Sequence, residues 1–454
     1  MQDSQLKSVT CTCTKNNCSM EYHFSECLVA CQNGDCSRIQ QLLDKFPIAL
    51  HHTDSRGWTL VHYAALGGSQ ATIKQLCKAG LDPHTRDIYG ANILHIACFY
   101  GRVNLVKYLI KKYPKMYIQH DCYSWKSAHF AAQGGSVDTM RLFVETDTDF
   151  TLKDQYGANV LHLACGFGSY QLVEFLLLQF PELLHEVGEN NGTAAHYAAQ
   201  GGYVRVMELL VQHGVNLNSR TIHNMNVLHT ACQHRNVEVV KYLLKINASL
   251  LGQSGLYNWS AAHFAAQGGS VDVLKLISVD VQMVRKRSIA GENILHIACL
   301  HGHYDMVKHI LTLYPDMLDE LGKYYWSASH YAAKSGNVHI MELLGRYKLP
   351  KKTRSGTNAN ELHIACRYGH ENMVQYLLDV MPSLSKEKGE YGWTAYHYAA
   401  LGGSLRIMNM LAESGLDIRH ENESVIKVLE IASVHRDKEF EKNVKFLVEH
   451  TARV

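Results

Sequence analysis

Histidines recur through this sequence at a nearly fixed spacing, and that repeat limits the folds the chain can adopt. Eleven of the 28 histidines are separated by alternating steps of 33 and 34 residues. These ladder histidines are His62, His95, His129, His162, His196, His229, His263, His296, His330, His363 and His397. The same step leads back to Leu28 and forward to Glu430, which makes thirteen units with two degenerate ends. Units this small cannot bury a core alone, so the repeat predicts a stack of similar structural units.

Each unit contains two short stretches with the spacing of a helix. In one unit, a glycine-containing turn at 89–92 precedes an apolar stretch at 93–98, and a second stretch covers 103–111. In the second stretch, Val106 and Leu109 lie three residues apart, on one face of a helix. Turn residues separate the two stretches, so each unit is predicted to be a helix-turn-helix.

The two steps sum to 67 residues, and other residue types follow this longer period. Alternate units, which we name A units, carry a cysteine: Cys31, Cys98, Cys165, Cys232, Cys299 and Cys366. Prolines follow the second stretch of most A units: Pro47, Pro114, Pro181, Pro315 and Pro382. All five tryptophans fall in the intervening B units, with Gly192 at the vacant place: Trp58, Trp125, Trp259, Trp326 and Trp393. Duplication of a two-repeat cassette explains this pattern more simply than thirteen independent units.

A unit of about 33 residues with x-Leu-His-x-Ala at its first helix resembles the ankyrin repeat. The resemblance covers residues 21–454 and implies an all-α solenoid of stacked helix-turn-helix units joined by β-hairpin-like loops. It also implies that the ladder histidines hydrogen-bond the turns. We expect residues 1–20 to form a polar, disordered N-terminal segment, and the degenerate first and last units to act as caps.

The start of the first helix departs from the family's Thr-Pro-Leu-His. No unit has the proline, and half the units have an asparagine, as at Asn159, whose side chain can cap a helix. The others have Ser or Thr followed by Ala, as at Ser260. We therefore expect less ideal helix starts than in consensus ankyrin arrays.

Composition excludes several classes of protein. Lysine plus arginine is 44 and aspartate plus glutamate is 42, and the resulting net charge of +2 argues against nucleic-acid binding. No apolar run approaches the roughly 20 residues of a membrane-spanning helix, and the first 20 residues contain no signal-peptide core. We expect a monomeric cytoplasmic protein without membrane insertion, with a nuclear location as the alternative.

Catalytic and metal-binding patterns are missing from the sequence. There is no nucleophile constellation, glycine-rich phosphate loop or recurring carboxylate pair, so we expect neither enzymatic activity nor a cofactor. Stacked helices lie roughly 8–10 Å apart, so ladder histidines cannot share a metal ion, and the A-unit cysteines cannot form disulfides. We interpret these cysteines as small buried packing residues. Cys11, Cys13 and Cys18 form a separate cluster without a clear fourth zinc ligand, which favours reduced thiols.

The tryptophans are the first candidate for partner binding. Each lies in the turn before a first helix, and in ankyrin arrays the corresponding positions project to the concave face. Tryptophan is enriched among binding hot spots. The alternative is that each ring packs over a neighbouring unit, where equivalent A positions such as Ala91 and Ala158 are small. Strict periodicity favours packing, because binding patches usually vary between repeats.

Variable positions between the first helix and the following glycine of A units are the second candidate. They include Tyr100, Phe167, His234, His301 and Tyr368. In the family, these positions also face the concave groove, and aromatic residues suit recognition. A solvated surface without function is the alternative.

Two basic loops and one asparagine complete the candidates. The loops contain Arg285, Lys286 and Arg287, and then Lys351, Lys352 and Arg354. The loops lie where the family places its hairpin tips, and there they could grip an acidic segment, although a charge run is more often a solvated face. Asn218 closes a Gly-x-Asn-x-Asn stretch that is similar to the acceptor site of asparaginyl hydroxylases in ankyrin arrays.

Together these features predict a non-enzymatic scaffold that binds a so far unidentified protein partner on its concave face. The alternative is a substrate-recognition, targeting or regulatory subunit of an enzyme complex, such as a ligase or a phosphatase. Only a recruited catalytic partner would separate the two hypotheses.

Overall fold

The computed structural model describes residues 15–47, 50, 52–146, 148–279, 281–347 and 355–416, with backbone only for 15–22. Contacts divide the chain into two compact units, Met1–Ile222 (unit 1) and His223–Val454 (unit 2). Most of the N-terminal segment 1–20 and all of the expected C-terminal cap lie outside the described residues. So do the side chains of the cluster Cys11, Cys13 and Cys18. Helix α1 begins at Lys15 and therefore crosses the boundary that we placed at residue 20.

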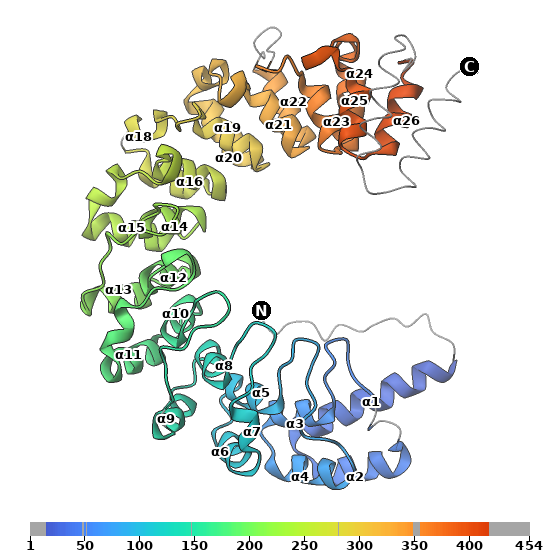
Figure 1. Ribbon diagram of the computed structural model, residues 1–454, viewed down its shortest axis with the longest axis vertical. Helices are drawn as coiled ribbons and strands as arrows, with labels where there is room; N and C mark the ends of the chain where they lie inside the picture. The colour runs from blue at the N-terminus through green and yellow to red at the C-terminus, as the bar shows by residue number, and fades with distance from the viewer. Residues whose placement is uncertain are drawn as a thin grey trace. The chain divides into compact units, whose positions relative to one another are not determined.

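In most repeats a short, largely buried helix is followed by a longer amphipathic one (Figure 1). In unit 1 they are α1 Lys15–Asn33, α2 Cys36–Lys45, α3 Leu60–Gly67, α4 Gln70–Lys78, α5 Ile93–Phe99, α6 Val103–Lys112, α7 Pro114–Tyr117, α8 Ser127–Gly134, α9 Val137–Glu145, α10 Val160–Gly166, α11 Tyr170–Gln179, α12 Ala194–Gly201 and α13 Val204–Gln212, with 3-10 helices η2 Pro181–His185 and η3 Glu189–Asn191.

In unit 2 the α-helices are α14 Val227–Gln233, α15 Val237–Ile246, α16 Ala261–Gly268, α17 Val271–Ile277, α18 Val281–Arg285, α19 Ile294–Leu300, α20 Tyr304–Leu313, α21 Ala328–Ser335, α22 Val338–Arg346, α23 Glu361–Arg367, α24 Glu371–Val380, α25 Ala395–Leu401 and α26 Leu405–Glu413. The 3-10 helices are η4 Ala248–Gly252, η5 Leu256–Asn258, η6 Pro315–Asp319, η7 Lys323–Tyr325, η8 Pro382–Lys386 and η9 Glu390–Gly392. In the described part, no helix has the length and hydropathy needed to cross a bilayer.

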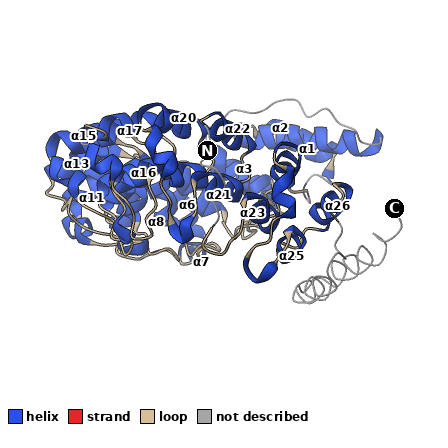
Figure 2. Cartoon of the chain, turned by 90° about the horizontal axis from the view of Figure 1, so that it is seen from above, coloured by secondary structure: helices blue, strands red, loops and turns tan. Residues whose placement is uncertain are grey.

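The all-α repeat solenoid expected from the sequence is confirmed. Across the described ranges the chain consists of helices and loops, with a single antiparallel bridge between Val187 and Thr193 in place of strands (Figure 2). The expected hairpin-like loops are tight turns whose tips are joined by backbone hydrogen bonds. For example, Cys122 N–H donates to the Tyr89 carbonyl at 2.8 Å, and Ile289 N–H donates to Tyr257 at 2.8 Å.

Prolines of the A units begin a further short helix directly after the second helix has ended. Pro114, Pro181, Pro315 and Pro382 stand in the first turn of α7, η2, η6 and η8. A proline fits there because the first turn of a helix leaves its N–H groups unpaired and needs the φ that the ring fixes.

Ladder histidines and asparagines close the start of each first helix. In α5, Asn92 Oδ1 accepts the N–H groups of Leu94 and His95, both at 3.0 Å. His95 Nδ1 accepts the Asn92 N–H at 3.3 Å, and its Nε2 donates to the Gln119 carbonyl at 3.3 Å. A bond from the capping residue's N–H to the histidine Nδ1 recurs at all eleven ladder histidines. The helix starts are therefore better satisfied than the sequence predicts.

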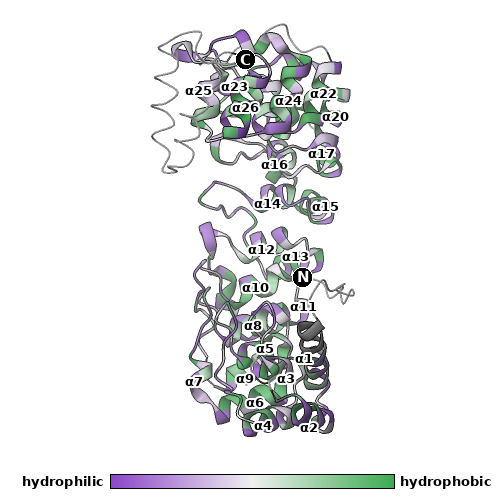
Figure 3. Ribbon diagram, turned by 90° about the vertical axis from the view of Figure 1, so that its right-hand side faces the viewer, coloured by the Kyte–Doolittle hydropathy of each residue, from purple (hydrophilic) through white to green (hydrophobic). Residues whose placement is uncertain are grey.

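Small buried residues let neighbouring first helices approach one another. In unit 1 the first helices α3, α5, α8, α10 and α12 pack in sequence, and in unit 2 α14, α16, α19, α21, α23 and α25 do so (Figure 1). Figure 3 shows both hydrophobic and hydrophilic residues on the helices of each unit. Cys98 and Cys299 are fully buried free thiols whose pKa is raised by burial, as expected for packing residues.

The Gly-Gly pair at the end of most B-unit first helices has a packing reason. A Cβ on Gly134 would overlap the carbonyl oxygen of Phe99, the last residue of α5. Gly135 follows with φ 71°, a left-handed conformation that glycine adopts without steric cost. The B helix therefore ends against the last residue of the preceding A helix.

Candidate functional site

Five of the predicted site residues occupy one structural position, the residue that ends the first helix of an A unit. We call them the C-cap row. In unit 1 they are Tyr100 and Phe167, which end α5 and α10. In unit 2 they are His234, His301 and Tyr368, which end α14, α19 and α23. The row is exposed except at Tyr100, which is half-buried, and Phe167 and Tyr368 expose 46% and 43% of their surface.

Backbone geometry holds each row side chain at a defined place. The Tyr368 N–H donates to the Ile364 carbonyl at 3.1 Å, and the next residue, Gly369, turns the chain with φ 75°. His370 then reaches back, with its Nε2 2.8 Å from the Lys334 carbonyl oxygen of the preceding B helix. The row position is thus fixed on both sides by hydrogen bonds.

The same back-reaching contact occurs elsewhere along the row. His303 Nε2 lies 2.8 Å from the Gln267 carbonyl oxygen, and Arg102 Nε donates to Leu66 at 2.7 Å. Because two neighbouring repeats are joined by a hydrogen bond at each of these points, the row residues stand on a supported surface. Less conformational entropy is then lost when a partner binds.

The row in unit 2 carries little charge of its own. Burial lowers the pKa of His234 below its ordinary value. Burial also lowers the pKa of His301, and the charges of His303 and Lys334 lower it further. Both imidazoles are therefore neutral at pH 7, and each offers one donor and one acceptor nitrogen.

Lys334 adds a cation beside this neutral row. Its Nζ lies 5.3 Å from the centre of the Tyr368 ring and 5.9 Å from that of Trp326. In unit 1, the Phe99 ring meets Tyr100 edge-on with centroids 4.8 Å apart. The row presents aromatic faces and imidazole nitrogens, the side chains that anchor protein interfaces.

The tryptophans lie inside a chain of aromatic contacts that we call the aromatic relay. Trp326 stacks on the ladder histidine His330 with centroids 6.0 Å apart, and meets Tyr331 edge-on at 5.4 Å. Tyr331 in turn stacks on His296 of the preceding A unit at 5.0 Å. The same order of rings recurs at Trp125, Trp259 and Trp393.

The relay connects successive repeats, as expected if the tryptophans are packing residues. Trp58 is 8% exposed and the other four are half-buried. Two indoles also hydrogen-bond within the chain: Trp58 Nε1 donates to Asp87 at 3.1 Å and Trp125 Nε1 to Asp154 at 2.8 Å. A partner contact by these rings stays a prediction.

The first basic loop has partners within its own chain. Arg285 forms a two-pronged ion pair with Asp316, with N–O distances of 2.6 and 3.2 Å. Arg287 donates to the Gly291 and Leu321 carbonyls, and Lys286 donates to Ser254. These bonds occupy the cations that an acidic partner would need.

The remaining predicted residues are less informative. Lys351, Lys352 and Arg354 lie outside the described residues. Asn218 is exposed in a turn, where its N–H donates to Asn216 Oδ1 at 2.9 Å, and its hydroxylation stays a prediction. Within the described ranges, no group of three or more His, Cys, Asp or Glu side chains could hold a metal ion. A cavity beside Lys126, which the sequence analysis did not identify, is described below.

Comparison with known proteins agrees with the geometry of the units. A family model for ankyrin repeats, which spans three copies, matches overlapping stretches that run from residue 27 to residue 422. They are residues 27–120, 114–181, 178–254, 247–319, 262–355, 313–389 and 329–422.

Three similar proteins have different names. The probable E3 ubiquitin-protein ligase XBOS32 of Oryza sativa subsp. japonica is 30% identical over 148 residues, 26% of this chain and 30% of that protein. Palmitoyltransferase AKR1 of Lachancea kluyveri is 24% identical over 221 residues, 46% of this chain and 30% of that protein. The target of rapamycin complex 2 subunit AVO2 of Saccharomyces cerevisiae is 27% identical over 154 residues, 33% of this chain and 36% of that protein. The matches therefore span only about a third of each relative's length.

Proposed function

The chain belongs to the ankyrin-repeat family, whose repeats serve protein–protein interaction, and we propose that it is a non-enzymatic scaffold that binds a protein partner through the C-cap row. The proposed surface is the face that is concave in arrays of this family. The C-cap row carries the proposal, because exposed aromatic and imidazole side chains recur at one supported position on the ends of buried helices.

The row is a better candidate than the tryptophans because four of its five side chains are exposed. Phe167 and Tyr368 expose nearly half of their surface, whereas each tryptophan packs against the ladder histidine of its own repeat. A partner that docks on the row gains contact area without disturbing the core. The neutral imidazoles and the Lys334 ammonium favour a partner with aromatic or apolar side chains beside hydrogen-bonding groups.

A second candidate function is a recognition or regulatory subunit of an enzyme assembly. It is favoured by the names of the relatives, which are a ubiquitin-protein ligase, a palmitoyltransferase and a subunit of target of rapamycin complex 2. The same row would then receive the substrate or the catalytic partner.

The test compares two triple variants of unit 2 with matched spacing. In the row variant, His234, His301 and Tyr368 become serine. In the control variant, the exposed last residues of the second helices, Ile246, Leu313 and Val380, become serine. Each protein is used for affinity capture, and every captured protein is then purified and titrated against both variants.

The proposal expects a purified partner that binds the wild type and the control variant but binds the row variant at least tenfold more weakly. Equal binding to both variants would remove the row from the interface. A row-dependent partner with catalytic activity would select the enzyme-subunit function over the simple scaffold.

A further inference from the structure

One junction in unit 1 departs from the cassette pattern at several positions at once. Before the first helix, the other B units have Thr59, Thr193, Ser260, Ser327 and Thr394, and this one has Lys126. At the next position, the others have Leu60, Ala194, Ala261, Ala328 and Ala395, and this one has Ser127. A cationic residue has replaced the capping hydroxyl, and a hydroxyl has replaced an apolar side chain.

Two further polar replacements belong to the same junction. Tyr117 stands 67 residues before Leu184, which is 7% exposed. Thr148 stands midway between Leu81, which is 9% exposed, and Val215, with 67 residues on each side. Each replacement puts a hydroxyl where another unit has a branched apolar side chain.

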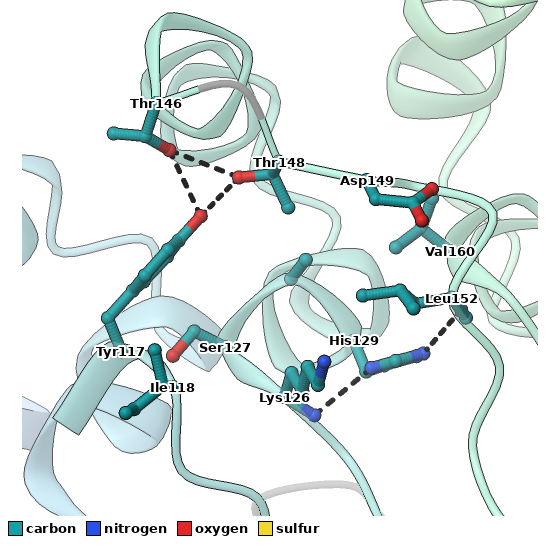
Figure 4. Close-up of a pocket in the computed structure, with 11 residues that line it drawn as sticks. Tyr117, Ile118, Lys126, Ser127, His129, Thr146, Thr148, Asp149, Leu152 and Val160 are labelled. Atoms are coloured by element: carbon teal, nitrogen blue, oxygen red, sulfur yellow. Dashed lines mark hydrogen bonds between the residues drawn. The ribbon is translucent and has the colours of Figure 1, made fainter. Parts of the chain in front are cut away.

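These four residues line one cavity between α7, α8 and the segment that follows α9 (Figure 4). Its volume is about 230 Å³, smaller than the roughly 300–1,000 Å³ typical of pockets for drug-sized ligands. Ile118, Leu152 and Val160 supply apolar wall, and Asp149 supplies a carboxylate. Asp147, which precedes Thr148, lies outside the described residues. The cavity suits a small polar molecule with a short apolar part.

Ser127 adds a second polar group beside the cavity. The residue is 1% exposed, and its hydroxyl hydrogen-bonds the Cys98 thiol, whose pKa burial raises and this bond lowers. A thiol is a weak donor and acceptor, so this buried hydroxyl is poorly satisfied.

The helix α8 starts at this wall. As in the other B units, no side chain accepts a hydrogen bond from the first turn of this eight-residue helix. Free N–H groups and the helix dipole favour an anionic group at this position, and the Lys126 ammonium adds a full positive charge.

The opposite wall is negative. Asp149 Oδ1 accepts hydrogen bonds from the Thr151 N–H at 2.9 Å and from its hydroxyl at 2.6 Å. These bonds lower the pKa of Asp149, so the carboxylate is charged at pH 7. Among the described side chains, Lys126 and Asp149 form no ion pair with each other or with a neighbour. His129 is neutral because burial lowers its pKa.

The cavity thus holds one positive and one negative group apart, with no net charge. A dianion such as phosphate would meet the Asp149 carboxylate, whereas a molecule with one anionic and one cationic end complements both walls.

We propose that this cavity binds a small zwitterion with the chemistry of a free α-amino acid, a function separate from the partner surface. Its carboxylate lies at Lys126, Ser127 and the start of α8, and its ammonium group lies at Asp149. Its side chain contacts Ile118, Leu152 and Val160.

The test titrates the full chain with each of the common L-amino acids, by calorimetry and by ligand-observed NMR. Three variants restore the residues of other units: Lys126→Thr, Ser127→Ala and Thr148→Leu. Because these residues occupy the same place in sister units, the variants are expected to fold, and melting temperatures verify this. Lys115→Thr removes an exposed lysine of α7 as the matched control.

We expect at least one amino acid to bind saturably to the wild type and the control. Binding should weaken at least tenfold in Lys126→Thr and be lost in Thr148→Leu, which fills the cavity. The amide of that amino acid and its deaminated acid should bind at least tenfold more weakly. Absence of binding by every amino acid, binding unchanged in the folded variants, or binding of inorganic phosphate alone would each overturn the proposal.

Discussion

Two kinds of turn carry the tryptophans, and the two units of the molecule use them differently. The first B turns of unit 1 are organised by an aspartate, and the described B turns of unit 2 by a glycine. In unit 1, Asp54 Oδ1 accepts the N–H groups of Arg56 and Trp58 at 2.9 and 2.8 Å. The last turn of unit 1, at Gly188, is already of the glycine kind.

In unit 2, the aspartate positions hold Gly255, Gly322 and Gly389. A Cβ on Gly322 would lie 2.7 Å from the Tyr331 hydroxyl, because the tyrosine ring covers the space that an aspartate side chain would fill. The chain then turns through tyrosines with left-handed backbone, Tyr257, Tyr324 and Tyr391, at φ 57°, 58° and 58°.

Both units contain the aromatic relay, but different groups hold the indole rings in place. Unit 1 supports the indole by hydrogen bonds to Asp87 and Asp154, whereas Trp259 Nε1 in unit 2 is buried without a partner in the described structure. Unit 2 instead packs a ring against a glycine and accepts backbone strain at an exposed tyrosine. The turns therefore differ in which substitution will damage them.

Acid should destabilise unit 1 and unit 2 alike, because both contain buried ladder histidines. Burial lowers the pKa of His62, His162 and His263 to about 4, and that of His95 and His296 to about 3. The unfolded chain, with a histidine pKa of about 6.5, binds more protons below that pH, so stability falls as pH falls. Each such histidine should cost about 2 kcal/mol between pH 6.5 and pH 5.

Denaturant unfolding at pH 7 and pH 5 measures this loss, with near-ultraviolet signals from the tryptophans reporting both units. We expect the midpoints of both units to fall together. A flat profile above pH 5 would show that the histidines are not buried in their neutral form.

Gly322→Ala tests the glycine turn. The added Cβ displaces the Tyr331 ring without backbone strain, since Gly322 has φ −93°. We expect a loss of roughly 1–3 kcal/mol in the free energy of unfolding. Gly252→Ala in η4 is the control, because nothing lies within 4 Å of its Cβ position. Equal effects of the two variants would argue against the ring-on-glycine contact.

Asp154→Ser gives unit 1 the residue type of unit 2, which has Ser288 and Ser355 at the equivalent places. The serine can still accept the Ala158 N–H but not the Trp125 indole, so we expect a loss of roughly 1–3 kcal/mol. Asp138→Ser, on the exposed face of α9, controls for the lost charge. A variant as stable as this control would mean that the indole bond contributes nothing.

Tyr257→Asn should change stability least, and in the opposite direction to Tyr123→Asn, the equivalent variant in unit 1. Asparagine tolerates left-handed backbone, and Tyr257 is 62% exposed, so we expect a gain of about 0.5 kcal/mol. Tyr123 stacks between Tyr89 and Tyr156, each at 6.3 Å, so Tyr123→Asn should lose about 0.5–1 kcal/mol. Thermal unfolding of both variants distinguishes the signs, and a loss at Tyr257 would contradict the strain argument.

Much of the fold could be predicted because it depends on local periodicity. The spacing of His95 and its equivalents gave the units, and their bonding role followed from the family resemblance. The turns could not be predicted, because each left-handed tyrosine follows a glycine against which a ring of the next helix packs, and that contact exists only in the folded chain. The role of the prolines was also missed, since a proline that stops one helix can begin the next.

The candidate site was predictable only in part. Variation between A units identified Tyr100 and Tyr368, but their place at the supported ends of helices needed the structure. The cavity had a signal in the sequence, since Lys126 stands where every other B unit has Ser or Thr. Its meaning was hidden because Tyr117 ends α7, whereas Thr148 follows α9, and the two meet only in the folded chain.

The most direct test of the central claim compares Trp326→Ala with Tyr368→Ala, two rings that share the Lys334 cation in unit 2. Unfolding free energy and affinity for the purified partner are measured for both. We expect Trp326→Ala to lose roughly 2–4 kcal/mol of stability and keep its affinity when folded. Tyr368→Ala should lose under about 1 kcal/mol of stability and roughly 2 kcal/mol of binding. The reverse order in both measurements would place the interface on the tryptophans and contradict the account.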